Sequence, residues 1–158
     1  TGITNRQELG RLLDKELARA ARYASPLSLI MYDLDHFKRI NDRFGHNAGD
    51  DVLKTLTLRV NQTLRDTDLH GRWGGEEFMV LLPETGLEAA SKVAEKLRRT
   101  IADHRFAGIG SVTASFGVAQ LAAGEDARSL VQRVDEALYR AKALGRNRVA
   151  SWIATERG

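Results

Sequence analysis

Apolar side chains near the start of the chain repeat at the spacing of one helical face, and this pattern predicts an amphipathic helix over residues 5–24. Two residue pairs have the spacing of a capping box at its start, namely Thr4 with Gln7 and Asn5 with Glu8. The following run, LSLIMYDL at Leu27–Leu34, is almost continuously apolar. A run of this kind predicts a central strand that is buried on both faces.

The next segment has the pattern of two helices in succession. Apolar residues three and four positions apart predict a short helix over residues 36–44 that ends at Gly45. We expect residues 46–49 to form a loop and Asp50 to cap a second helix, whose buried face contains Leu53, Leu56, Val60 and Leu64. Capping of backbone amides is the ordinary explanation for an acidic residue at the position of Asp50.

Two strand-like segments, residues 69–73 and 78–82, flank a Gly-Gly-Glu-Glu string. Glycine adopts positive φ without steric cost, so Gly74 and Gly75 are expected to form the turn of a hairpin. Successive strand residues point to opposite faces, so only one of Glu76 and Glu77 is expected to face a given side of the sheet. Taken alone, the string is typical of a solvated hairpin at a sheet edge.

The remaining chain alternates helices and strands. Thr85 and Glu88 have the spacing of a capping box before an apolar helical pattern, and a second such pattern ends at Gly145. Residues 112–121 and 148–153 have the composition of strands. A hairpin mixed with crossover helices predicts an α+β fold, in which helices cover the faces of the sheet.

Composition narrows the classes of protein. The 158 residues suit a single domain, and the absence of cysteine excludes disulfides and thiolate metal sites and fits a reducing cytoplasm. No apolar run approaches the length of a membrane helix, so we expect no membrane contact by this domain. The net charge of +3 is modest, and without a dense basic block it does not indicate a nucleic-acid partner. It is compatible with a small polyanion such as a nucleoside triphosphate.

Several charged residues suggest metal-assisted phosphoryl chemistry. A carboxylate at the end of a buried strand is costly to desolvate unless a cation or several donors meet it, which makes Asp33 a candidate ligand. Asp33 and Glu76 could hold one or two magnesium ions, which prefer oxygen ligands, and Lys38, Lys142 and Arg146 could bind phosphates. Each feature also has an ordinary explanation, because strand-end aspartates often belong to turns and lysines near helix ends often interact with the helix dipole.

Taken together, four stretches resemble the signatures of one family. They are TGITNR at the start, DLDHFKRINDRFGHNAGDDVL from Asp33 to Leu53, GGEEF from Gly74 to Phe78, and KALGRN from Lys142 to Asn147. In their order and spacing they resemble GGDEF domains, the diguanylate cyclases. The resemblance implies a palm-like, ferredoxin-like sheet of the nucleotidyl cyclase type, mostly antiparallel and flanked by helices. It also implies condensation of two GTP into cyclic di-GMP and two pyrophosphates, across a homodimer.

The resemblance also implies roles for the acidic hairpin and its surroundings. Asp33, the backbone carbonyl of Leu34 and Glu76 correspond to the metal ligands, with two Mg²⁺ ions in each active site and Mn²⁺ as a substitute. Glu76 corresponds in addition to the residue that helps to deprotonate the attacking 3′-hydroxyl. Glu77 is the other acid of the signature, and the resemblance does not separate its role from that of Glu76. Lys38 corresponds to a residue that stabilises phosphate charge in the transition state.

Nucleotide-binding roles follow in the same way. Asn41 and Asp50 correspond to the residues that recognise guanine, and a carboxylate suits the N1 and N2 donors that adenine lacks. The glycines of the hairpin, Gly74 and Gly75, would let the backbone pass close to the nucleotide. Lys142 and Arg146 correspond to residues that hold the terminal phosphates.

A further motif lies upstream of the hairpin. Arg65 and Asp68 form an RxxD string, and such a pair is commonly a surface ion pair of little energetic value. At this distance from Gly74 it resembles the family's inhibitory site for cyclic di-GMP, where arginine pairs with guanine and phosphate. Lys96 lies where some members carry a secondary basic contact for the product.

The chain opens inside a motif that is longer in the family, so we expect it to be a catalytic domain excised from a protein with an N-terminal regulatory part. The alternative function is a catalytically silent module that senses GTP or cyclic di-GMP. Such modules usually lose the signature acids, and this chain keeps Asp33, Lys38, Glu76 and Glu77. The sequence therefore favours an active enzyme.

Overall fold

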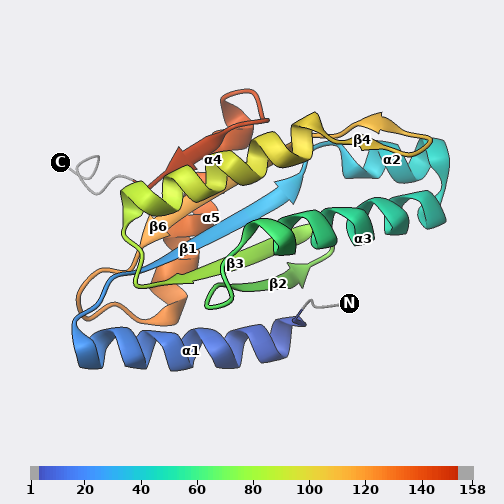
Figure 1. Cartoon of the computed structure of the whole chain (residues 1–158). Helices are drawn as coiled ribbons and strands as arrows, with labels where there is room; N and C mark the ends of the chain where they lie inside the picture. The colour runs from blue at the N-terminus through green and yellow to red at the C-terminus, as the bar shows by residue number, and fades with distance from the viewer. Residues whose placement is uncertain (1–3, 153–158) are drawn as a thin grey trace.

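The computed structural model describes residues 4–152 and contains a central sheet with helices on both faces (Figure 1). None of the helices in this range is long and apolar enough to cross a membrane. The elements, in chain order, are α1 (Arg6–Tyr23), β1 (Leu27–Leu34), α2 (Phe37–Phe44), α3 (His46–Thr63), β2 (Leu69–Gly74), β3 (Glu77–Pro83), α4 (Leu87–Asp103), β4 (Arg105–Phe106), β5 (Gly110–Ser111), β6 (Ala114–Gln120), α5 (Ala127–Ala143) and β7 (Val149–Ser151).

The main sheet has the strand order β2-β3-β1-β6-β7. Its pairings are antiparallel except for β6 with β7, which is parallel, so the expected mostly antiparallel α+β sheet is confirmed. Every one of the 8 residues of β1 is buried, as its apolar run predicted. Side chains of alternate β1 residues enter two separate cores, one beneath α3 and α4 and the other beneath α1 and α5.

The first helix begins as one of the two predicted capping pairs requires. The Asn5 side chain accepts a hydrogen bond from the backbone N–H of Glu8 at 2.9 Å, so Asn5 is the N-cap. Just before it, Thr4 forms a bridge with Gly71 of β2. The start of α1 is thereby attached to the strand that leads into the hairpin.

The prediction for the segment between α2 and α3 was wrong. No loop spans residues 46–49, because α3 begins at His46 and Gly45 alone joins the two helices. Gly45 has φ of 93°, a conformation that glycine adopts readily and that reverses the chain at one residue. Asp50 therefore lies inside α3 and does not cap it, so the ordinary explanation for this acid does not apply.

The hairpin is present, but its turn is one residue later than predicted. Gly74 ends β2 and pairs with Glu77, and Gly75 and Glu76 form the turn, with Gly75 at φ of 48°. The register shifts between Arg72 and Gly74, which is the signature of a bulge. This bulge places Glu76 in the turn and Glu77 at the start of β3.

The predicted capping box before α4 was also wrong. The N-cap is Gly86, and the N–H of Leu87 donates to the side-chain oxygen of Gln120 at 2.8 Å. The Thr85 hydroxyl instead donates to the carbonyl of Pro83 at 2.9 Å. The small β4–β5 hairpin was not predicted. The last predicted strand is confirmed as β7, and residue 153 lies outside the described residues.

Candidate functional site

The candidate site lies where β1 ends, and Asp33 is a buried acid at its centre. Asp33 is 7% exposed, and its Oδ2 atom accepts a hydrogen bond from Lys142 Nζ of α5 at 2.5 Å. Its Oδ1 atom is buried and has no hydrogen-bond partner among the described residues. Burial raises the pKa of Asp33, and the Lys142 ammonium opposes this shift. One oxygen of a buried carboxylate is therefore available to a ligand.

The two hairpin glutamates lie close enough to Asp33 to affect it. Glu77 is the cross-strand neighbour of Asp33, whereas Glu76 lies in the turn. Burial is the main cause of a raised pKa at Glu77, and the charges of Asp33 and Asp135 add to it. Glu76 in turn raises the pKa of both Asp33 and Glu77. The structure thus places Asp33 and Glu77 side by side, within reach of the charge of Glu76 and of the Lys142 ammonium group.

This arrangement suits a cation that shares its ligands with a substrate. No cluster of three or more acidic, histidine or cysteine side chains within residues 4–152 has the geometry of a complete metal site. The unpaired Oδ1 of Asp33 and the carboxylates of the hairpin are nevertheless the hard oxygen donors that Mg²⁺ prefers. Magnesium usually keeps several waters and binds proteins through one or two carboxylates together with substrate phosphates. The residues present therefore fit the ion.

A pocket of about 570 Å³ opens between α3 and the hairpin strands. Asp50 lies at this pocket and is exposed, as expected of a residue that meets a ligand. Leu53 and Phe78 supply apolar surface that suits a flat base. Four further lining residues carried no signal in the sequence: Lys54, Thr57, Leu58 and Arg72.

The Asn41 side chain packs against α3 at Gly49, where the missing side chain leaves room for it. A Cβ atom at Gly49 would lie 1.9 Å from Asn41 Oδ1 and 3.1 Å from the Phe37 ring. Asn41 Oδ1 is itself buried and has no partner in the described part of the chain. A buried acceptor without a donor is costly and points to a ligand. Gly49 is thus a positioning residue that the sequence did not single out.

Arg72 supports the turn of the hairpin. Its Nε atom donates to the carbonyl oxygen of Gly75 at 2.6 Å, and its side chain also lines the pocket. The bond fixes the turn that carries Glu76. Gly74 and Gly75 have open space around their Cα atoms, since a Cβ atom at Gly75 would meet nothing within 4 Å and one at Gly74 would meet only Arg6, at 3.9 Å.

The remaining predicted cations, Lys38 and Arg146, are both exposed. Lys38 is exposed at the second position of α2, and Arg146 is exposed in the turn between α5 and β7. Arg146 has φ of 64° and its neighbour Asn147 has φ of 47°, so two consecutive non-glycine residues are left-handed. Lys142 is the one predicted phosphate-binding residue that the structure places in contact with a predicted metal ligand.

Asp35, the second acid at the end of β1, has a different environment from Asp33. It is buried, and it accepts hydrogen bonds from the hydroxyls of Thr113 and Ser115, each at 2.7 Å. A third bond comes from the backbone N–H of Asn147 at 3.0 Å. Asp33 is therefore matched by a cation and Asp35 by several donors, which are the two ways to stabilise a buried carboxylate.

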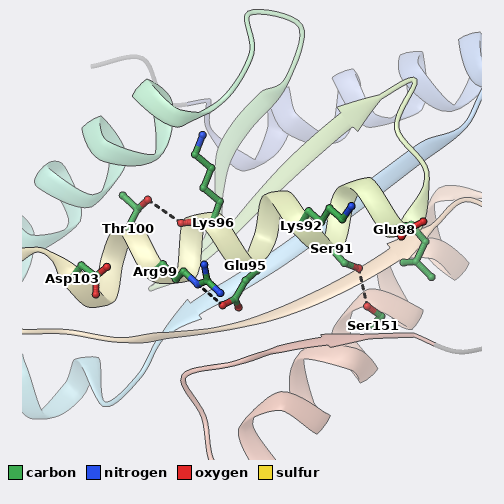
Figure 2. A pocket seen from close by; sticks show the side chains of 10 residues that line it. Glu88, Ser91, Lys92, Glu95, Lys96, Arg99, Thr100, Asp103 and Ser151 are labelled. Carbon is green, nitrogen blue, oxygen red and sulfur yellow. Dashed lines mark hydrogen bonds and ion pairs between the residues drawn. The ribbon is translucent and has the colours of Figure 1, made fainter.

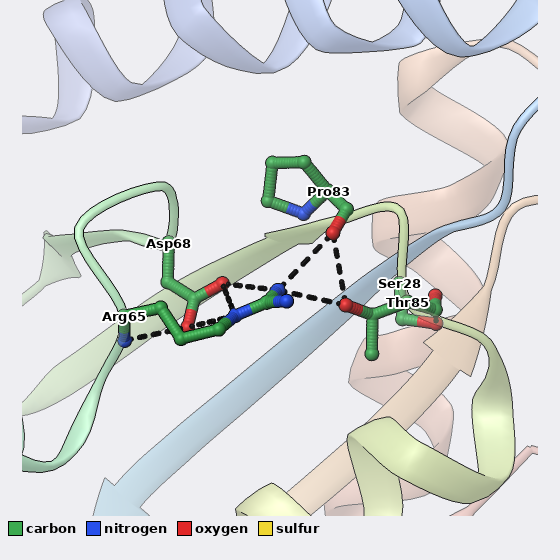
Figure 3. Close-up of polar contacts among 5 residues, drawn as sticks. All are labelled: Ser28, Arg65, Asp68, Pro83 and Thr85. Carbon is green, nitrogen blue, oxygen red and sulfur yellow. Dashed lines mark hydrogen bonds and ion pairs between the residues drawn. The ribbon is translucent and has the colours of Figure 1, made fainter.

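The RxxD pair is part of a larger set of contacts at the loop before β2 (Figure 3). Arg65 Nη2 lies 2.8 Å from Asp68 Oδ1, and the Arg65 backbone N–H donates to Asp68 Oδ2 at 2.9 Å. The same guanidinium reaches the carbonyl of Pro83 and the hydroxyl of Thr85. Because the Asp68 side chain is 3% exposed and that of Arg65 is 55% exposed, the pair presents mainly its cation to solvent.

Lys96 lies apart from these contacts on α4. It lines a groove of about 1100 Å³ that runs along the helix, and Figure 2 shows its side chain projecting from α4 separately from the bonded pair Glu95 and Arg99. The ion pairs and hydrogen bonds of the described residues do not join Lys96 to the RxxD pair. The structure therefore does not group Lys96 with Arg65 and Asp68, and the bond that it gives Lys96 is one from the Thr100 hydroxyl to its backbone carbonyl, at 2.8 Å.

Comparison with known proteins connects this geometry to a family. The family model described as "Diguanylate cyclase, GGDEF domain" matches residues 1–148. The chain belongs to the GGDEF domain family. The family resemblance inferred from the four sequence stretches is thereby confirmed.

Curated relatives with GGDEF domains are similar over nearly the whole chain. The diguanylate cyclase DgcP of Pseudomonas aeruginosa is 46% identical over 94% of this chain, and the response regulator PleD of Caulobacter vibrioides is 41% identical over 98% of it. The match covers 23% of DgcP and 35% of PleD. The chain therefore spans about a quarter to a third of the length of these relatives.

Solved GGDEF structures have the same fold. The active GGEEF domain of a diguanylate cyclase from Vibrio cholerae aligns with a TM-score of 0.92 and 39% identity, over 96% of this chain and 98% of that one. The GGDEF domain of DgcB from Caulobacter crescentus, in complex with c-di-GMP, aligns with a TM-score of 0.91 and 30% identity, over 96% and 92%. The palm-like fold predicted from the sequence is thus confirmed.

Proposed function

We propose that this chain is a diguanylate cyclase, which condenses two GTP into cyclic di-GMP and two pyrophosphates. The observation that carries the proposal is the buried Asp33, with one unpaired oxygen, beside Glu77 in a member of the GGDEF family. The nearby pocket at Asp50 has room for a purine base. We also propose that the reaction takes place in the cytoplasm, with no nucleic-acid or membrane contact by this domain.

The reaction needs two copies of the chain related by a two-fold axis. Each copy binds one GTP, and the 3′-hydroxyl of each nucleotide attacks the α-phosphorus of the other. In each half-reaction one P–O bond forms and the bond to the β-phosphate oxygen breaks, which releases pyrophosphate. Because the product is a two-fold symmetric ring, a symmetric homodimer matches it.

Acidic residues would bind the metal ions and accept the proton of the attacking hydroxyl. Asp33, the backbone carbonyl of Leu34 and Glu76 would hold Mg²⁺, two ions in each site, with Mn²⁺ as a substitute. When bound, such ions neutralise phosphate charge and make the hydroxyl more acidic. Glu76 accepts the proton of the attacking 3′-hydroxyl. Glu77 lies directly opposite Asp33, and we assign it to the same carboxylate cluster.

Basic and amide residues hold the nucleotide. Lys38 stabilises the charge that develops on the phosphates, and Lys142 and Arg146 bind the terminal phosphates. Asn41 and Asp50 recognise the guanine, since the Asp50 carboxylate accepts from N1 and N2, and adenine lacks those donors. The open backbone at Gly74 and Gly75 lets the nucleotide approach the hairpin.

Product inhibition is the second part of the proposal. Arg65 has a well-exposed guanidinium held by the buried Asp68, and this arrangement suits recognition of guanine and phosphate. Lys96 would add a secondary basic contact. The solved DgcB domain in complex with c-di-GMP supports binding of this product by a member of the family.

Product analysis tests the activity. The purified chain is incubated with GTP and Mg²⁺, and the nucleotides are separated by chromatography. We expect cyclic di-GMP from the unchanged chain and a loss of about 10²-fold or more in Glu76→Gln, at an unchanged melting temperature. Glu88→Gln, which changes an exposed glutamate of α4, is the matched control. Binding of GTP without any product would identify the chain as the silent sensing module.

A binding measurement tests the inhibitory site. Arg65→Ala should weaken cyclic di-GMP binding about tenfold or more and raise the final product yield, because it removes a charge-assisted bidentate contact. Arg11→Ala removes another arginine that pairs with an acid three residues away, and it should change neither quantity. Equal affinity of Arg65→Ala and the unchanged chain would refute the site.

A further inference from the structure

The turn between α5 and β7 carries Arg146 in an unfavourable backbone conformation. Arg146 and Asn147 are both left-handed, with φ of 64° and 47°. Asparagine tolerates this region and arginine does so only at a cost, so a pair of such residues persists where surrounding contacts hold it.

Two contacts from different parts of the fold meet at Asn147. Its backbone N–H donates to Asp35 Oδ2 at the end of β1 at 3.0 Å, and its side-chain Oδ1 accepts from Arg98 Nη1 of α4 at 2.8 Å. Asp35 and Arg98 are thereby attached to the same residue. Both the backbone and the side chain of Asn147 are fixed.

Both anchors are rigid. Asp35 is 6% exposed and is itself held by two hydroxyls from the segment around β6. Arg98 is held by Glu95, which accepts from its Nε and Nη2 atoms at 2.8 Å each. The Arg98 side chain is 19% exposed. Neither anchor is therefore a freely moving surface side chain.

The anchored turn lies next to the carboxylate cluster. Asp35 is two residues beyond Asp33, and Lys142, which binds Asp33, lies four residues before Arg146. The backbone N–H of Arg146 donates to the carbonyl of Ala141 at 3.0 Å, which attaches the turn to the end of α5. The backbone at Arg146 is thus attached on one side to the end of α5 and on the other, through Asn147, to Asp35 and Arg98.

We propose that Asp35 and Arg98 are positioning residues that act through Asn147 to hold Arg146 where it binds the terminal phosphates of GTP. This inference rests on the proposed function. It gives Arg98, on a helix that supplies none of the proposed catalytic or substrate-binding residues, a specific effect on triphosphate binding. Pre-positioning lowers the entropy that is lost when a long side chain binds a phosphate.

The test compares two nucleotides and two arginines. The chain is titrated with the non-cleavable analogue α,β-methylene GTP and with GMP, and binding is followed by NMR. Arg98→Met should weaken the triphosphate analogue about three- to tenfold and leave GMP unchanged, because GMP lacks the phosphates that Arg146 binds. Arg99→Met is the matched control, since Arg99 pairs with the same Glu95 carboxylate from solvent and makes no bond to Asn147 in the described structure. It should change neither affinity.

A double substitution separates positioning from general damage. In an Arg146→Ala background, Arg98→Met should cause no further loss, because the residue that it positions is gone. Asn147→Gly keeps the left-handed turn but removes the acceptor of Arg98. It should weaken the triphosphate analogue about three- to tenfold and leave GMP unchanged, and it therefore tests the inference independently if Arg98→Met does not fold.

Several outcomes would overturn the inference. Equal weakening of both nucleotides by Arg98→Met would indicate general damage to the fold, and additive losses in the double variant would show that Arg98 does not act through Arg146. If Arg146→Ala weakens the analogue but Arg98→Met and Asn147→Gly do not, this inference fails and the proposed function stands. If the unchanged chain binds neither nucleotide, both fail.

Discussion

Lys142 Nζ lies 2.5 Å from Asp33 Oδ2, so the lysine predicted to hold phosphates contacts the aspartate predicted to hold metal. The ammonium group lowers the pKa of both Asp33 and Glu77 and so opposes the effect of burial on these two carboxyls. Without it, Asp33 would be a buried acid next to Glu77 with no ion pair to another of the described residues. Lys142 on Oδ2 and a divalent cation on the unpaired Oδ1 would therefore share one carboxylate, so that their charges oppose each other, and triphosphate binding would draw Lys142 away from it.

Substitution of Lys142 should separate these two roles. Lys142→Met removes the competing charge, so Mg²⁺ alone should bind about fivefold more tightly, as expected for an ion pair worth about 1 kcal/mol. Binding of the Mg²⁺ complex of α,β-methylene GTP should become weaker, because a phosphate contact is lost. Calorimetry with each ligand measures both. Lys142→Arg keeps the charge and should change neither affinity in this way. Tighter Mg²⁺ binding together with weaker binding of the nucleotide complex, in Lys142→Met but not in Lys142→Arg, would support the opposition of the two charges.

Glu77→Gln should stabilise the fold while it lowers activity. Burial and the nearby acids raise the pKa of Glu77, so its ionised form opposes folding at neutral pH. We expect urea unfolding to show a small gain in stability at pH 7, below about 1 kcal/mol because the side chain is partly exposed. The gain should disappear below pH 4.5, where the glutamate is protonated in both states. Glu88→Gln should change stability by less than about 0.5 kcal/mol. A less stable Glu77→Gln protein would contradict this account.

Gly49→Ala should weaken nucleotide binding through Asn41. The new Cβ atom would lie 1.9 Å from Asn41 Oδ1, so the amide must leave its position. We expect about a tenfold loss of affinity for α,β-methylene GTP, the usual value of a hydrogen bond in a desolvated site. The control is Gly10→Ala on α1, where a Cβ atom meets nothing within 4 Å, and it should raise stability slightly and leave binding unchanged. Unchanged binding in Gly49→Ala would remove Asn41 from the guanine site.

His70 should make stability depend on pH in a defined window. Burial lowers its pKa from 6.5 to about 4, and its ring nitrogens lie 2.7 Å from the Tyr32 hydroxyl and 2.9 Å from Asn61 Oδ1. Below pH 6.5 the unfolded chain gains a proton on this imidazole that the folded chain does not bind, so the free energy of unfolding falls as the pH falls towards about 4. The whole loss from this group amounts to about 3 kcal/mol.

Urea unfolding between pH 7.5 and pH 5 measures this loss before carboxylates titrate strongly. The matched variant is His70→Gln, which keeps a polar side chain but does not titrate. Its unfolding free energy should be lower than that of the unchanged chain at pH 7.5 and should fall less steeply as the pH drops. Parallel curves for the two proteins would show that His70 does not cause the pH dependence.

The sequence predicted correctly those helices and strands whose own pattern of apolar residues determines their structure. The apolar run of β1 and the periodic apolar residues of α1, α4 and α5 produced strands and helices where expected, because burial of those side chains decides the local structure. The errors concern residues that have an alternative partner. Thr85 does not cap α4 because its hydroxyl donates to the carbonyl of Pro83 and accepts from Arg65. The N–H of Leu87 instead donates to the side chain of Gln120, which is distant in sequence.

The supporting residues of the site could not be found in this way. Asp35 and Asn147 are 112 positions apart, and their bond exists only because the end of β1 and the turn after α5 meet in the folded domain. Gly49 has no side chain to indicate a role, and its importance depends on the position of Asn41 across the α2–α3 joint. The small β4–β5 hairpin has two residues in each strand, which is too short for an alternating pattern to appear.

The central position of β1 also has a consequence for how the domain folds. This strand is the first to be synthesised, yet its two neighbours, β3 and β6, follow much later in the chain. During synthesis β1 stays without any sheet partner until β3 has left the ribosome, and its other edge stays unpaired until Gln120, the partner of Ser28, has followed. Pairing over such separations is slow, and an unpaired apolar strand is prone to aggregation. We expect nascent chains that end before β6 to need chaperones, and Asp33 to reach its final surroundings only late in folding.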